Sequence, residues 1–66
     1  MSALCLTQQD DDLWELSFCG DLVGWIRRFQ PEGRRVCLYQ AETPRGEIRH
    51  CYSLNQARNT LLELYA

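Results

Sequence analysis

Apolar residues occur in runs along the chain, and short groups of turn-forming residues separate these runs. Gly20-Asp21 is the first group, and residues 31–33 (Pro-Glu-Gly) and 43–46 (Thr-Pro-Arg-Gly) are the second and third. Glycine and proline in such groups are typical of tight turns between antiparallel strands. The pattern predicts a meander of four strands, at about residues 13–19, 22–29, 34–41 and 47–52. It leaves open whether residues 3–7 add an edge strand, because the polar stretch 8–12 follows them.

A helix is predicted at the end of the chain. Ser53-Leu54-Asn55-Gln56 has the pattern of a capping box, in which Ser53 accepts from the first-turn amides and Gln56 reaches back. Leu54, Ala57, Leu61 and Leu64 then recur at steps of three and four, which indicates an apolar stripe over about residues 54–65. Since 66 residues have room for one core, residues 1–66 are predicted to form a single α+β domain. In it, a four-stranded antiparallel meander is followed by one C-terminal α-helix packed on one sheet face.

The turns also predict a strand register. A two-residue loop at Gly20-Asp21 would pair Phe18 with Val23 and Leu16 with Trp25. A three-residue loop at 31–33 would set Trp25 opposite Tyr39, and a two-residue loop at Pro44-Arg45 would pair Tyr39 with His50. One face would then be aromatic, with Trp14, Leu16, Phe18, Val23, Trp25, Phe29, Tyr39, Ile48, His50 and Tyr52, and with Arg27 and Arg35 among them. The opposite face would carry Leu13, Cys19, Leu22, Ile26, Val36, Leu38 and Cys51. Because small Ser17 and Gly24 would pair on this second face, we expect the helix to pack there.

One helix covers only one face of such a sheet, so an apolar face would be left over. An exposed apolar patch usually marks an interaction surface, and aromatic and arginine side chains are typical of interface centres. The candidate partner-binding residues are Trp14, Trp25, Arg27, Phe29, Arg35, Tyr39 and His50. A homodimer with two stacked sheets is the simplest arrangement, with a further protein partner also favoured. An N-terminal segment folded over this face is the alternative.

Charge is unevenly distributed along the chain. The net charge is −2, the first 21 residues hold five acids and no base, and residues 27–49 hold six of the seven basic residues. All of these basic residues are arginines, a composition that hints at the source more than at the mechanism. The apolar face left over and the small size suggest a compact regulatory or inhibitory protein of bacterial or phage type. No secretory leader pattern or membrane-length apolar run is visible, so we expect a cytoplasmic protein without membrane contact.

The sequence offers little support for catalysis or metal binding. His50 is the only histidine, and its predicted neighbour Cys37 would need a third, orienting residue to act as a nucleophile pair. The four cysteines include no Cys-x-x-Cys pair, so free thiols are expected in place of zinc or disulfides. The glycines form no phosphate-binding pattern, and Asp10-Asp11-Asp12 lacks a shaping glycine. The chain is therefore predicted to be no enzyme and to need no cofactor or metal.

A nucleic-acid function is the alternative. The predicted strands are followed by a helix that opens with Ser53-Leu54-Asn55-Gln56-Ala57. Over about residues 22–64, this order of elements loosely resembles that of the arm-site DNA-binding domains of phage-type integrases. The resemblance implies a sheet that enters the major groove. Trp25, Arg27, Arg35, Tyr39 and Arg45 would then contact the DNA.

Overall fold

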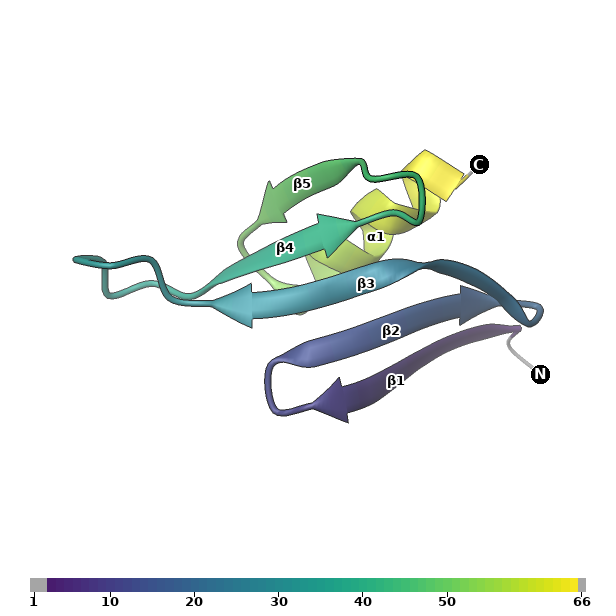
Figure 1. The fold of residues 1–66 in the computed structure, drawn as a ribbon, viewed down its shortest axis with the longest axis horizontal. Helices are drawn as coiled ribbons and strands as arrows, with labels where there is room; N and C mark the ends of the chain where they lie inside the picture. The colour runs from purple at the N-terminus through teal and green to yellow at the C-terminus, as the bar shows by residue number, and fades with distance from the viewer. Residues whose placement is uncertain (1–2, 66) are drawn as a thin grey trace.

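The computed structural model describes residues 3–65, which form an antiparallel sheet with one α-helix on one of its faces (Figure 1). The sheet has five strands in the order β1-β2-β3-β4-β5. Their bounds are β1 Leu4–Asp10, β2 Leu13–Phe18, β3 Asp21–Phe29, β4 Leu38–Glu42 and β5 Ile48–Cys51, and helix α1 spans Leu54–Tyr65. The α+β fold with an antiparallel sheet and a C-terminal helix is confirmed, whereas the prediction of four strands was wrong.

The additional strand is β1, which pairs with β2 from Leu4 opposite Phe18 to Gln8 opposite Trp14. All of its residues except Leu4 are exposed. Because the side chains of β1 are solvent-exposed on both faces of the sheet, apolar and polar residues do not alternate along it. The sequence pattern therefore did not reveal the extent of this strand. The polar stretch 8–12 is the end of β1 and its turn.

The turn between β2 and β3 lies one residue earlier in the chain than predicted. Its central residues are Cys19 and Gly20, with φ angles of 53° and 84°, and Phe18 lies opposite Asp21. Positive φ at both positions is typical of a type I′ hairpin turn. The register then shifts between Leu16 and Ser17. As a result Leu16 lies opposite Gly24 and not opposite Trp25.

The β3–β4 connection is longer than predicted, because β4 begins at Leu38 and not near residue 34. Residues 30–37 form a loop that projects from the sheet (Figure 1). Within it the Arg34 N–H donates to the Pro31 carbonyl oxygen at 3.1 Å, and Gly33 has the expected left-handed conformation. The predicted pairing of Trp25 with Tyr39 is therefore wrong, and Glu42 lies opposite Trp25.

The β4–β5 turn contains three residues in place of the predicted two. The Thr43 N–H donates to the Glu47 carbonyl oxygen at 2.9 Å, so residues 44–46 lie between the paired ends. Tyr39 consequently lies opposite Cys51, and not opposite His50 as predicted.

Helix α1 packs over β3, β4 and β5 (Figure 1). The core between helix and sheet consists of Leu16, Val23, Ile26, Ala41, Cys51, Ala57 and Leu61. The helix covers the face with Gly24 and Ile26, as expected. The shifted registers nevertheless bring Trp14 and Tyr39 to this side and move Leu13 and Leu38 to the other.

The start of α1 follows the predicted capping pattern. The Gln56 N–H donates to Ser53 Oγ at 3.1 Å, and Gln56 Oε1 accepts from the Tyr52 N–H at 2.9 Å. These bonds satisfy one amide donor just before the helix and one in its first turn, which favours a helix that begins at Leu54.

Candidate functional site

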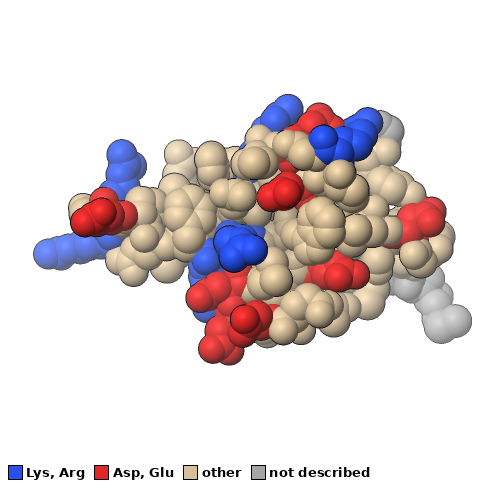
Figure 2. Space-filling view, viewed as in Figure 1, with Lys and Arg blue, Asp and Glu red and all other residues tan. Residues whose placement is uncertain are grey.

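The sheet face opposite α1, called here the open face, is covered by no element formed by residues 3–65. The strand registers bring together on it Leu13, Glu15, Trp25, Arg27, Phe29, Leu38, Gln40, Glu42, Ile48 and His50. Figure 2 shows this face, on which both signs of charge are scattered over a largely uncharged surface. Because α1 packs on the other face, this face is the candidate interaction surface of the sheet.

Trp25 lies at the centre of one cross-strand row. Glu15 on β2 and Glu42 on β4 lie directly opposite Trp25 on its two sides. Side chains in such positions are neighbours, about 5 Å apart at their β-carbons. Both carboxylates are half-buried, and neither forms a salt bridge with another described residue. An indole ring flanked by two carboxylates is suited to a cationic group of a partner.

The next row contains Leu13, Arg27, Gln40 and His50 on four adjacent strands. The rings of His50 and Phe29 make an edge-to-face contact, with centroids 5.9 Å apart and planes at 66°. This contact extends the open face toward the projecting loop. Arg27 is the exposed cation of the row and has no salt bridge among the described residues.

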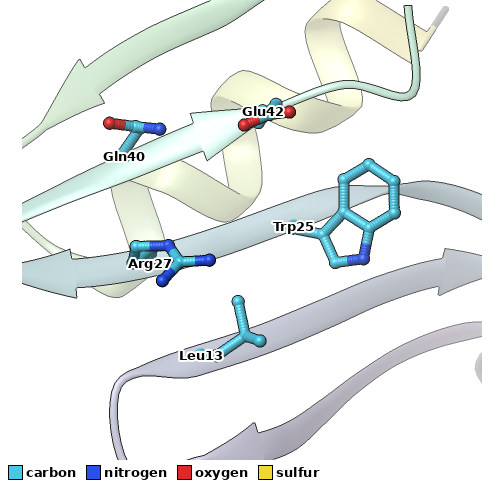
Figure 3. Close-up of a pocket in the computed structure, with 5 residues that line it drawn as sticks. All are labelled: Leu13, Trp25, Arg27, Gln40 and Glu42. Carbon is cyan, nitrogen blue, oxygen red and sulfur yellow. The ribbon is translucent and has the colours of Figure 1, made fainter. Parts of the chain in front are cut away.

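A shallow pocket of about 280 Å³ lies between the two rows. Leu13, Trp25, Arg27, Gln40 and Glu42 line it, and their side chains project from the same side of β2, β3 and β4 (Figure 3). The lining combines an indole, an aliphatic group, an amide and one charge of each sign. Pockets for cofactors and drug-sized ligands are about 300–1,000 Å³. The pocket is therefore close to the lower end of this range, and it has room for one side chain of a partner.

Four of the seven predicted site residues lie together on the open face: Trp25, Arg27, Phe29 and His50. Arg35 lies in the exposed loop 30–37, away from the rows of the sheet. Trp25, Arg27 and Phe29 are alternate residues of β3, and they share one face as predicted.

Trp14 and Tyr39 instead pack against the core on the helix side, with ring centroids 6.2 Å apart. The Arg28 guanidinium lies over the Trp14 ring at 5.6 Å, and it donates to an Asp12 carboxylate oxygen at 2.9 Å. That hydrogen bond raises the pKa of Arg28 above its usual value. The predicted place of Trp14 and Tyr39 on the same face as Trp25 was therefore wrong, because each hairpin register was shifted.

Glu15, Gln40 and Glu42 also belong to the site, although they were not predicted from the sequence. The β2–β3 turn itself had a signal, since type I′ turns favour glycine at their second central position and Gly20 follows Cys19. That turn alone would set Glu15 opposite Gly24, and the register shift between Leu16 and Ser17 brings Glu15 opposite Trp25. The length of loop 30–37 has no comparable signal.

The arrangement gives no specific support to nucleophilic catalysis. Cys37 lies in loop 30–37, so its predicted cross-strand relation to His50 is absent. Across residues 3–65, no three histidine, cysteine or acidic side chains are grouped so that they could hold a metal ion. The described helix is also too short and too polar to cross a membrane.

No protein-family model matches the chain, and comparisons with curated proteins and with solved structures find no significant match.

Proposed function

We propose that this protein is a small non-enzymatic binding protein, regulatory or inhibitory in role, whose open face binds a protein partner. The observation that carries the proposal is the pocket beside Trp25, on a face with half-buried aromatic and aliphatic groups. Such a combination is typical of the residues that dominate protein interfaces.

The charges of the open face indicate the kind of partner. Glu15 and Glu42 flank Trp25, so a partner that inserts an arginine or lysine side chain there would gain both carboxylate and cation–π contacts. Arg27 would pair with an acidic group beside it. The proposed partner therefore carries an apolar patch with a basic residue at its centre.

The test uses the purified chain as bait in extracts of its native host. Trp25→Ala should lose the captured partner, whereas Tyr65→Ala, which removes an aromatic ring that is 44% exposed on helix α1, should retain it. A recombinant partner should then bind in a titration with the same ranking of variants. Equal capture by both variants would contradict the open face as the binding surface.

A homodimer and a reducing, cytoplasmic location are also part of the proposal. All four cysteines carry free thiols, three of them exposed, which suits a reducing compartment. A bacterial or phage origin remains a hypothesis from composition.

Binding to duplex DNA is a second candidate, favoured by exposed Arg34 and Arg35 on the projecting loop and by Arg27 on the open face. Strands β3 to β5 followed by α1 keep the element order of the integrase arm-site resemblance. Glu15 and Glu42 would repel phosphate, which places this function second. Binding at low salt that weakens with Arg27→Ala and Arg35→Ala but not with Arg49→Ala would support it. The absence of any binding at low salt would exclude it.

A further inference from the structure

The open face itself carries the kind of surface that the proposed partner requires. Arg27 is exposed near its middle, and Leu13, Trp25 and Phe29 are half-buried around it. Arg27 forms no salt bridge with another residue of the described chain. Its guanidinium group is therefore available to a second molecule.

The row of Trp25 and the row of Arg27 are adjacent on the sheet. Trp25 and Arg27 are two positions apart on β3, so their side chains project from the same side, about 7 Å apart along the strand (Figure 3). One row presents an indole ring between the carboxylates of Glu15 and Glu42, which suits a cation. The next row presents an unpaired cation. The two rows are therefore complementary to each other.

We infer that the open faces of two copies stack, with Arg27 of each copy on Trp25 of the other. This arrangement rests on the proposed function, because it assigns the same face to a second copy of the chain. The two-fold axis lies between the two sheets, crosses β3 at right angles and passes between Trp25 and Arg27. Rotation about it places the two β3 strands antiparallel and exchanges the two rows, so every contact occurs twice.

The usual geometry of stacked sheets allows these contacts. Sheets that pack face to face lie about 10 Å apart, and their strands cross at about 30° because each sheet is twisted. This crossing displaces residues least near the two-fold axis, which is where Trp25 and Arg27 lie. An extended arginine side chain fills the space between the sheets and brings its guanidinium group onto the opposite indole ring.

Stacking also gives the buried charges opposite partners. Each Arg27 guanidinium group lies next to Glu15 and Glu42 of the other copy and has enough N–H donors for both carboxylates. Gln40 is beside Arg27 in its row, so its amide group comes opposite Glu42 of the other copy and can donate to it. No salt bridge of these residues has to break first. Such pairing and hydrogen bonding are what buried charges require.

The first test is the self-association of the purified chain. In sedimentation, the mass of the natural chain should rise from the 7.8 kDa of a monomer to twice this value as the concentration increases. Arg27→Glu places like charges together at the centre of the interface, so it should stay monomeric where the natural chain is dimeric. Trp25→Ala should do the same, and it covers the case in which Arg27→Glu fails to fold.

The matched control is Arg49→Glu. It makes the same change of charge on β5, but Arg49 lies opposite the core residue Ala41 and hence on the helix side of the sheet. This variant should remain dimeric.

A complementation experiment tests the reciprocal contact itself. The double variant Glu15→Arg/Glu42→Arg places two cations beside Trp25, so it should be monomeric by itself. In an equal mixture with Arg27→Glu, position 27 of each copy meets opposite charges, and the two variants should form a mixed dimer. Circular dichroism of each variant alone establishes that both are folded.

Three results would overturn the inference. The first is a natural chain that stays monomeric at all concentrations; if it still captures a host protein that Trp25→Ala loses, the open face belongs to that protein. The second is equal weakening of the dimer by Arg27→Glu and Arg49→Glu. The third is the absence of a mixed dimer from folded variants. A dimeric natural chain that captures no host protein would contradict only a separate protein partner.

Discussion

Gly24 on β3 lies directly beneath Leu61 of α1, so closely that a β-carbon at position 24 would come 2.8 Å from Leu61 Cδ2. The same β-carbon would also overlap the backbone carbonyl oxygen of Glu42. The absence of a side chain therefore sets the distance between helix and sheet. It also holds β4 next to the part of β3 that carries Trp25.

Replacement of Gly24 by alanine should loosen this packing. Because the β-carbon meets backbone on one side and a buried leucine on the other, we expect Gly24→Ala to lower the free energy of unfolding by about 1–3 kcal/mol. Urea unfolding followed by circular dichroism measures this loss. Ser17→Ala, on β2 outside the helix contact, is the control and should change stability little. Equal midpoints for the two variants would contradict the close approach.

Thr43 should stabilise the β4–β5 turn through its hydroxyl group. Its side chain is buried, and Oγ1 accepts from the Glu47 N–H at 3.1 Å. Thr43→Val keeps the shape but removes the acceptor, so we expect a loss of about 1 kcal/mol and faster hydrogen exchange at the Glu47 amide. Thr43→Ser should keep that amide protected. Equal exchange in the two variants would show that the hydroxyl does not hold the turn.

The four cysteines should differ in reactivity. Cys5, Cys19 and Cys37 are exposed, whereas Cys51 is buried in the core with its sulfur 3.6 Å from Thr60 Oγ1. A thiol reagent should therefore titrate three groups rapidly in the folded protein and the fourth only after unfolding. Cys51→Ser should remove the slow group and leave the three rapid ones. Rapid reaction of all four in the natural chain would contradict the packing of α1 on β5.

Ser53 should contribute to helix stability through its cap. Its Oγ accepts the Gln56 N–H, and loss of such a cap costs about 1 kcal/mol. We expect Ser53→Ala to lower stability by about this amount in thermal unfolding. Ser53→Asp keeps an acceptor and adds a favourable charge at the helix N-terminus, so it should match the natural chain. A destabilised Ser53→Asp variant would argue against the cap.

Local sequence patterns determined several parts of the molecule. The capping residues fixed where α1 begins, because Ser53 and Gln56 act within one turn. Gly33 and Gly46 marked two turns correctly, since both have positive φ. The alternation along β3 also placed Trp25, Arg27 and Phe29 on one face, because neighbouring side chains in a strand point to opposite sides.

Only the tertiary structure decided how the strands align and which residues share the open face. A change of one residue in the register moves every side chain of the next strand to the other face. Such changes came from the register shift between Leu16 and Ser17 and from the third residue in the turn 44–46. As a consequence, Glu15 and Glu42 flank Trp25, whereas Trp14 and Tyr39 pack against the core on the helix side. The extent of β1 was likewise invisible, since hydrogen bonds to β2, and not burial of its own side chains, hold it in the sheet.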